Sequence, residues 1–145
     1  MKAVLQRVTR ASVKIEGKIT GQINYGYLAL IGMGAGDNEE TCISMLEKIK
    51  KLRLFPDQDG KTNLDITNVN GEILIVSQFT LYADCRKGTR PGFTDAAPPQ
   101  TAEHLYNYFL EKAKTYFPMV QSGVFGAKME VELVNDGPFT IILEI

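Results

Sequence analysis

The chain is poor in cysteine and histidine: it has two cysteines, Cys42 and Cys85, and one histidine, His104. Two cysteines form neither a disulfide framework nor a zinc-binding spacing, so we expect reduced thiols and neither a metal nor a cofactor. We expect His104 to be an exposed or partly packed residue at the start of a helix. No imidazole base is then left for a serine or cysteine nucleophile, which argues against a hydrolase triad.

Two other site types are excluded by what their motifs lack. The acids Asp57, Asp59 and Asp65 are interspersed with turn residues and no histidine or cysteine joins them, so solvated loops explain them better than a metal site. The run Gly32-Met33-Gly34-Ala35-Gly36 is followed by Asp37 instead of the glycine of a dinucleotide-binding turn. An acid there would repel a pyrophosphate, so we interpret the run as a turn into a helix.

Long hydrophobic runs are also absent. No segment approaches the roughly 18 apolar residues of a membrane span, and Arg7 and Arg10 interrupt the N-terminus before a signal peptide could form. A chain of 145 residues with 44% hydrophobic residues fits one globular domain. We therefore expect a single cytoplasmic domain over residues 1–145.

The chain has no excess of positive charge. Its formal net charge is −1 and its pI is about 5.9. Proteins that coat nucleic acid neutralise many phosphates with Lys and Arg, so any contact with RNA is expected to be local.

The hydrophobic pattern predicts more strands than helices. A helix is predicted over 38–52, with Asp37 as N-cap, Glu40 completing a capping box, and Ile43, Leu46, Ile49 and Leu52 on one face. A second helix is predicted over 99–116, after an ordered loop over 84–100. Strands are predicted over 4–8, 12–16, 19–23, 27–33, 72–76, 128–134 and 139–145. This pattern indicates an α+β domain with a mostly antiparallel or mixed sheet that two helices cover on one face.

Two segments carry polar groups that a structural role explains only in part. The stretch Val76-Ser77-Gln78-Phe79-Thr80-Leu81-Tyr82 continues a buried strand, and strand alternation would place Gln78 and Thr80 on one face. An edge strand whose polar face is exposed to solvent is an equally good interpretation. The stretch Asn135-Asp136-Gly137-Pro138-Phe139-Thr140 has the composition of a turn, and alone it would be considered structural.

Three segments, in this order, resemble the signature segments of one enzyme family. They are Ser77-Gln78-Phe79-Thr80-Leu81-Tyr82-Ala83, Lys87-Gly88-Thr89-Arg90-Pro91-Gly92-Phe93 and Asn135-Asp136-Gly137-Pro138-Phe139-Thr140. Together with the start of the chain, residues 2–8, they resemble the D-aminoacyl-tRNA deacylases. The resemblance implies hydrolysis of the ester between tRNA and a D-amino acid, or glycine mischarged on an alanine tRNA.

The resemblance also implies a homodimer in which Gly137 and Pro138 enter the partner's pocket. In the family that peptide bond is cis. The carbonyl oxygens of the glycine and the proline point at the Cα of the bound amino acid, so that an L side chain would collide with the backbone. Arg7 resembles the arginine that braces this segment. Phe139 departs from the smaller β-branched residue usual after the proline.

For the reaction, the resemblance places backbone amides near Phe79 and Thr80 at the developing oxyanion, with Ser77 at the substrate and Gln78 orienting the ester. Thr80 is the motif's candidate nucleophile, but it has no base near it in sequence. We therefore favour attack by water, assisted by the hydroxyl of the RNA.

For the tRNA, the resemblance places Phe125 and Met129 against the terminal adenine, although both would also suit an ordinary core. The basic loop, with Arg86, Lys87 and Arg90, is expected to contact phosphate.

Two alternatives remain open. One is a non-catalytic RNA-binding or ribosome-associated module, against which the mildly acidic pI counts. The other is the related subgroup that removes mischarged L-alanine, and the segment from Ser77 to Ala83 favours the D-specific group over it.

Overall fold

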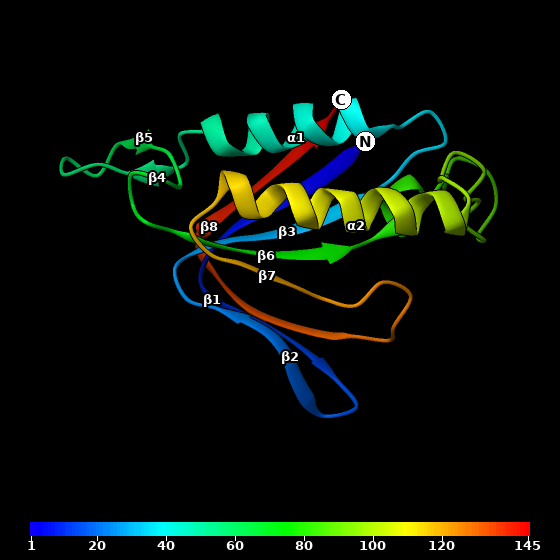
Figure 1. The fold of residues 1–145 in the computed structure, drawn as a ribbon, viewed down its shortest axis with the longest axis horizontal. Coiled ribbons are helices and arrows are strands. Elements are labelled where there is room, and N and C mark those ends of the chain that lie inside the picture. The colour runs from blue at the N-terminus through cyan, green and yellow to red at the C-terminus, as the bar shows by residue number, and fades with distance from the viewer.

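A six-stranded sheet carries both long helices on one of its faces in a computed structural model that describes residues 1–145 (Figure 1). The sheet consists of β1 (Lys2–Ile15), β2 (Lys18–Ile23), β3 (Gly26–Gly32), β6 (Glu72–Ser77), β7 (Val120–Ser122) and β8 (Glu130–Glu144). The helices are α1 (Glu39–Lys51), the 3-10 helix η1 (Phe79–Tyr82) and α2 (Pro99–Tyr116), and a separate hairpin joins β4 (Phe55–Pro56) to β5 (Thr62–Leu64). The predicted strand-rich α+β class is confirmed.

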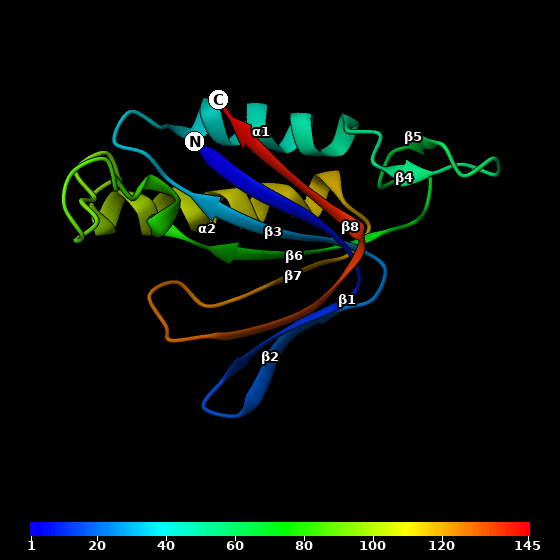
Figure 2. The ribbon, with the colours of Figure 1, turned by 180° about the vertical axis from the view of Figure 1, so that it is seen from behind.

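The sheet is mixed, and its long first strand organises it. β1 pairs antiparallel with β2, β3 and β8, whereas β3 pairs parallel with β6 and β6 with β7. The order is β2-β1-β3-β6-β7, with β8 along the other side of β1. Contacts from β2 to β6 and β7 make the sheet nearly closed. Figure 2 shows from behind how the part of the sheet with β2 curls towards β7.

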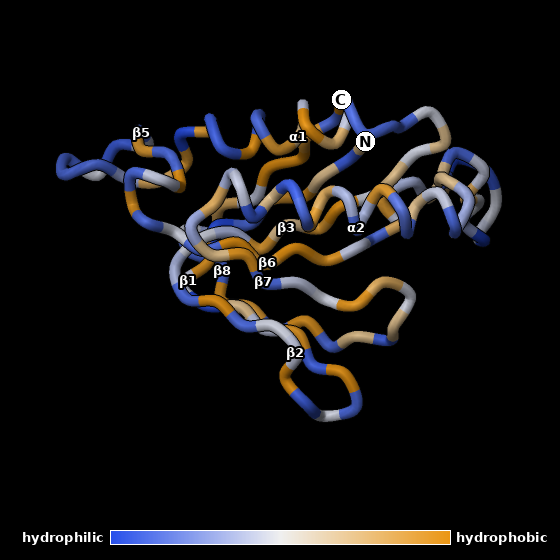
Figure 3. The backbone as a smooth tube through the Cα atoms, in the orientation of Figure 1, coloured by the Kyte–Doolittle hydropathy of each residue, from blue (hydrophilic) through white to orange (hydrophobic).

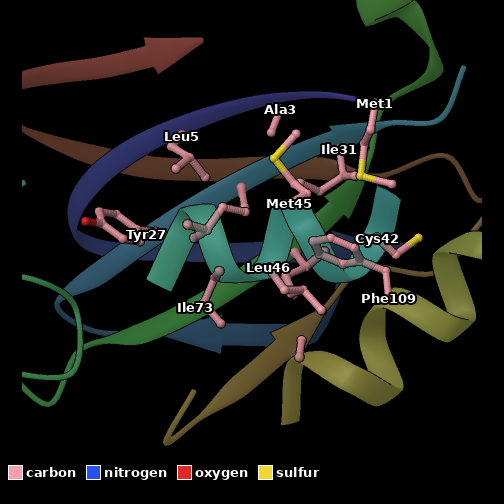
Figure 4. Close-up of a cluster of buried hydrophobic side chains, with 14 of the residues drawn as sticks. Met1, Ala3, Leu5, Tyr27, Ile31, Cys42, Met45, Leu46, Ile73 and Phe109 are labelled. Carbon is pink, nitrogen blue, oxygen red and sulfur yellow. The ribbon is translucent and has the colours of Figure 1, made fainter. Parts of the chain in front are cut away.

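Each face of the sheet has its own apolar core. The larger one lies beneath α1 and α2, where Met45, Leu46 and Phe109 pack on β1 and β3 (Figure 4). The smaller one lies on the other face and includes Val8, Ile23 and other apolar strand residues. The hydropathy colours follow this arrangement, with β3 and β6 hydrophobic and the β4–β5 hairpin largely hydrophilic (Figure 3). No helix combines the length and apolar character needed to cross a membrane.

Two pairs of predicted strands are single strands in the structure. The segments predicted over 4–8 and 12–16 form β1, and those predicted over 128–134 and 139–145 form β8. The turn-like residues between the last two do not end the strand, because β8 continues along β1 through register shifts around Val8. β4, β5 and β7 have two or three residues each and were not predicted.

The helix prediction was correct for α2, whose bounds are 99–116, and wrong at the start of α1. Asn38, not Asp37, is the N-cap, and the capping box pairs it with Thr41 instead of Glu40. Asp37 is unavailable for capping because it binds the N-terminal ammonium of the chain. The buried face of α1 consists of Cys42, Met45, Leu46 and Ile49, and the predicted Ile43 and Leu52 are only partly buried.

The strand prediction was also wrong beyond Ser77. β6 ends there, and Phe79–Tyr82 forms η1. The physical reason is the end of the neighbouring strand: β3 stops at Gly32, and its last pairing partner on β6 is Ser77 at Ile31. Without a ladder partner, the chain turns into a short helix.

Candidate functional site

A pocket of about 460 Å³ opens where β6 ends. Its volume lies within the range of small-molecule sites in proteins. Ser77, Gln78 and Phe79 form one wall, and Phe125 and Met129 form part of another. The remaining lining residues are Met33, Val76, Ala97, Pro99, Ala102, Gly126, Ala127 and Val131. The structure thus brings together two segments that lie about 50 residues apart and that the resemblance had assigned to one site.

The wall at the end of β6 is fixed by its backbone. Gln78 N donates to Ile31 O at 2.8 Å, and Leu81 N donates to Gln78 O at 3.2 Å. Phe79 and Thr80 are the first residues of a 3-10 turn. No carbonyl within the turn therefore accepts a hydrogen bond from their backbone N–H groups. Of these two residues, Phe79 lines the pocket and Thr80 follows it directly.

Gln78 and Thr80 are in direct contact, although not through strand alternation. The Gln78 Nε2 donates a hydrogen bond to Thr80 Oγ1. Gln78 lines the pocket, whereas Thr80 is exposed and does not line it. No titratable side chain is among the lining residues. The pocket can therefore position and polarise a bound group, but it offers no side-chain acid or base.

The opposite wall comes from the loop between β7 and β8 and the start of β8. Phe125 is partly buried and its ring lies 5.9 Å from that of Tyr106, whose hydroxyl donates to Ile75 O at 2.9 Å. Burial raises the pKa of Tyr106 well above its usual range. This contact packs Phe125 against α2, and Phe125 also lines the pocket.

The basic loop contacts one wall of the pocket, because its Phe93 packs against Phe79. Its ends are joined by paired hydrogen bonds between Asp84 and Gly92, and the Phe93 ring lies 5.0 Å from that of Phe79. Arg86 forms a two-pronged contact with the Asp84 carboxylate, with both N···O distances 2.8 Å. These bonds hold the pKa of Asp84 below its usual range.

The cations of the loop therefore differ in availability. The guanidinium of Arg86 already faces a carboxylate. Lys87 and Arg90 are exposed and have no ion-pair partner.

The Gly137-Pro138 segment lies on β8, with a cis peptide bond as the resemblance implied, and both residues are exposed. Arg7 supports it. Its Nε lies 3.0 Å from Asp136 Oδ2, and its Nη1 donates to Leu54 O at 2.6 Å. Asn135 Oδ1 accepts from Phe139 N at 2.6 Å and closes the bend from the other side.

This segment does not line the pocket of its own chain. Arg7, opposite the bend, pairs with Tyr27 on β3, whereas Ser77 at the pocket pairs with Ile31, four residues further along. Four residues of strand correspond to about 13 Å, and the intervening strands add about 4.8 Å each. The two predicted halves of the site are therefore at different places on one chain.

Several residues of the site were not predicted from the sequence. Met33, Ala97 and Ala102 line the pocket through the β3 exit and the start of α2, and only their place in the fold could identify them. Phe93 lies within a quoted motif but was assigned no role. Its 38% exposure beside the 55% exposed Phe79 is the structural signal, because exposed aromatic pairs are uncommon away from binding sites.

The protein is a strand-rich α+β protein with a nearly closed mixed sheet. It has a ligand-sized pocket at the end of one strand, beside a short helical turn. The sequence profile of the family described as D-Tyr-tRNA(Tyr) deacylase matches residues 4–144. The chain therefore belongs to this family.

Curated relatives cover almost the whole chain. A D-aminoacyl-tRNA deacylase of Thermosipho africanus is 52% identical over 144 residues, covering 99% of this chain and 97% of the relative. A protein of the same name from Fervidobacterium nodosum is 50% identical with the same coverage.

The structure described as c-Myc DNA Unwinding Element Binding Protein is 45% identical and superposes with a TM-score of 0.94, covering 100% of this chain and 99% of that one. A probable eukaryotic D-amino acid tRNA deacylase shares the fold at a TM-score of 0.88 and 16% identity, with 99% and 98% coverage.

Proposed function

We propose that this protein hydrolyses the ester bond of D-aminoacyl-tRNA and releases the free D-amino acid and the tRNA. The observation that carries the proposal is the pocket. It unites Ser77, Gln78 and Phe79 with Phe125 and Met129, and no acid, base or thiol lines it. Such a site suits a substrate that is already reactive, and full-length relatives named D-aminoacyl-tRNA deacylase support this assignment.

An aminoacyl ester needs little from protein side chains. Its α-ammonium group activates the carbonyl, and a ribose hydroxyl lies next to the ester. Positioning and stabilisation of the oxyanion can then supply most of the catalysis. In this proposal the amides of Phe79 and Thr80 donate to the oxyanion, Gln78 orients the ester, and water attacks with help from the ribose hydroxyl.

The other parts of the pocket bind the end of the tRNA. Phe125 and Met129 offer a flat apolar surface for the terminal adenine, since base stacking on aromatic and apolar groups is the usual way to bind unpaired RNA. Lys87 and Arg90 are the free cations of the loop that meets the pocket wall at Phe79, and in this proposal they contact phosphate. Arg86 contributes less because Asp84 already engages it.

Chiral selection requires a second copy of the chain. Gly137 and Pro138 are exposed and lie roughly 13 Å along the strands from the level of Ser77. In a two-fold dimer, the segment of one chain fills the pocket of the other, where its backbone excludes an L side chain at Cα. Glycine has no side chain to exclude, so glycyl-tRNA, including that mischarged on alanine tRNA, is also a substrate.

The defining experiment compares three substrates under one set of conditions. D-tyrosyl-tRNA should be cleaved rapidly, L-tyrosyl-tRNA should be spared, and glycyl-tRNA should be cleaved measurably. Equal rates on both enantiomers would contradict the chiral proposal. Tight tRNA binding without hydrolysis would indicate an RNA-binding module, and preferential cleavage of L-alanyl-tRNA would indicate the related subgroup.

A mixed dimer tests the origin of the two half-sites. One chain carries Gly137→Val with Pro138→Ala, and the other carries Gln78→Ala. Each homodimer should be impaired, and the purified heterodimer should regain one D-selective site of two. If the heterodimer recovers no selective activity, or a monomer verified by light scattering is fully active, each chain builds its own site.

A further inference from the structure

The N-terminal ammonium group of the chain is buried and has two hydrogen-bond partners. Met1 N donates to Asp37 Oδ1 at 2.6 Å and to Ile145 O at 2.7 Å, and the side chains of Met1 and Asp37 are 0% and 8% exposed. The Met1 side chain lies beside Ile31 in the core beneath α1 (Figure 4). Both chain ends lie side by side at this place in Figures 1 and 2.

Asp37 extends this contact towards the functional site. Its second oxygen, Oδ2, accepts a hydrogen bond from Gly34 N at 2.6 Å. The Tyr82 ring lies so close to Gly34 that a Cβ there would be 2.5 Å from the hydroxyl oxygen, so only glycine fits. Burial, and then the negative charge of Asp37, raises the pKa of Tyr82 to about 12. Lys2 Nζ lies 4.8 Å from the centroid of the same ring.

Two routes lead from this cluster to the pocket. Tyr82 is the last residue of η1, whose first residue, Phe79, lines the pocket. Gly34 and Ala96 form an isolated antiparallel β-bridge. Next to it, Ala97 N donates a hydrogen bond to Met33 O at 2.9 Å. Met33 and Ala97 are both lining residues. The Asp37 carboxylate therefore binds the strand exit at Gly34, and the Tyr82 ring at the end of the helical turn packs against the same glycine.

We propose that the Met1 ammonium group and Asp37 form a positioning pair that sets η1 for catalysis. Neither residue lines the pocket, so the pair acts through Gly34 and Tyr82. A formyl or acetyl group on Met1 N turns the ammonium into a neutral amide. Asp37 then loses its only cation in a buried place, where an unpaired charge is costly, and η1 loses its fixed anchor. Full activity thus requires an unblocked Met1 nitrogen.

This inference rests on the proposed deacylase function, because its main readout is the rate of ester cleavage. The pair touches the η1 side of the pocket, whereas Phe125 and Met129 come from the loop and strand on the other side. Misplaced reacting groups reduce the rate of the chemical step far more than binding. We therefore expect kcat to fall and KM to change little.

Four proteins test the pair with D-tyrosyl-tRNA: the unmodified chain, a chain with Gly-Ser placed before Met1, Asp37→Asn, and the combination. The matched control is Asp65→Asn, which weakens a hydrogen-bonded carboxylate of a different loop. Assays run at a temperature where circular dichroism shows every protein folded. We expect the extension and Asp37→Asn each to lower kcat about tenfold, with KM changed less than about twofold. Asp65→Asn should retain the original kcat.

The combined variant gives the decisive comparison. If Met1 N and Asp37 act as a unit, the combination should lose no more than about tenfold, because the second change removes a partner already lost. Multiplied losses of about a hundredfold, or full kcat in the extended chain, would overturn the proposal. The N-formyl chain, purified from cells with inhibited deformylase and checked by intact mass, should match the extended chain, and full kcat in it would also refute the pair. An inactive unmodified chain would instead refute the proposed function.

Discussion

The guanidinium carbon of Arg7 lies 4.8 Å from the centroid of the Phe139 ring. Phe139 occupies the position after the Gly137-Pro138 segment where a smaller β-branched residue was expected. Its ring covers the arginine while the guanidinium contacts Asp136 and Leu54 O. The departure therefore has a structural explanation: the larger side chain stacks on the residue that braces the bend.

Replacing both partners should reveal this stacking. Arg7→Leu should lower the free energy of unfolding by about 2–3 kcal/mol, because it leaves Leu54 O and Asp136 without their partner. Phe139→Leu should cost less. The double variant should show a coupling energy of about 0.5–1 kcal/mol, the usual size of a cation–π contact. Urea denaturation measures all three, and strictly additive losses would show that the stacking contributes nothing to stability.

The roles of Gln78 and Thr80 predict unequal losses of activity. Thr80→Ala should retain deacylation within about tenfold, because the proposed oxyanion donors are backbone amides. Gln78→Ala should lose about 10²-fold or more, as expected for a group that orients the reacting ester. Initial rates on D-tyrosyl-tRNA check this order. An acyl ester on Thr80, trapped by acid quenching and found by mass spectrometry, would reverse the interpretation and make Thr80 the nucleophile.

The sequence was sufficient for elements whose signal is local. α2 has its predicted bounds because a proline start and a regular apolar spacing coincide over 18 residues. The end of β6 was beyond local signals. Phe79 and Leu81 imitate strand alternation, and only the end of β3 at Gly32 removes the partner that a strand would need.

The residues of the site also divide into those with a local sequence signal and those placed only by the fold. Periodicity alone left Phe125 and Met129 as core candidates, and only the resemblance joined them to Ser77 and Gln78. Met33 and Ala97 belong to the pocket through a contact between the β3 exit and the start of α2, which no short motif encodes. The interpretation of Asp37 as N-cap failed because its partner, Met1 N, lies 36 residues away in the sequence.

The two thiols should differ sharply in reactivity. Cys85 is exposed in the basic loop, whereas Cys42 is fully buried under α2 and burial raises its pKa to about 12. Thiolate is the reactive form, so Cys42 should be inert. Ellman's reagent should detect one thiol per chain in the native protein and two in guanidinium. Cys85→Ser is the control, and rapid native reaction in that variant would show that Cys42 is accessible.

Asp65 should contribute stability that disappears in acid. Burial opposes its ionisation, but hydrogen bonds from Thr67 and Asn68 outweigh this and lower its pKa. A pKa lowered in the folded state gives stability above the unfolded value of about 3.9, which is lost as the pH falls through the folded value. Asp65→Asn should therefore cost roughly 0.5–1 kcal/mol at pH 7, allowing for solvent screening.

The measurement for Asp65 is urea denaturation of the original chain and the variant between pH 7 and pH 3. Their difference should shrink below about pH 4. Asp59→Asn serves as control, since its carboxylate accepts no hydrogen bond while its neighbour Asp57 accepts three. A difference for Asp65→Asn that stays constant down to pH 3 would show that its charge is not involved.

Gly137→Ala should impair both the fold and chiral selection. Gly137 has a φ of +136°, which L residues rarely adopt, and a Cβ there would lie 3.1 Å from Phe139 N and 3.3 Å from Arg7 Nη2. A residue in such a conformation costs about 1–3 kcal/mol. Gly17→Ala is a matched control, because Gly17 also has a positive φ of +77° but its Cβ would meet nothing within 4 Å. Gly137→Ala should lose more unfolding free energy than Gly17→Ala, because its Cβ meets Phe139 N and Arg7 Nη2 and its φ lies further from the left-handed helical region. Because the bend is proposed to exclude L side chains in a partner's pocket, Gly137→Ala should also narrow the ratio of D-tyrosyl to L-tyrosyl cleavage, whereas Gly17→Ala should leave it unchanged. An unchanged ratio in a Gly137→Ala protein of reduced stability would mean that the bend supports the fold and that another part of the pocket reads chirality.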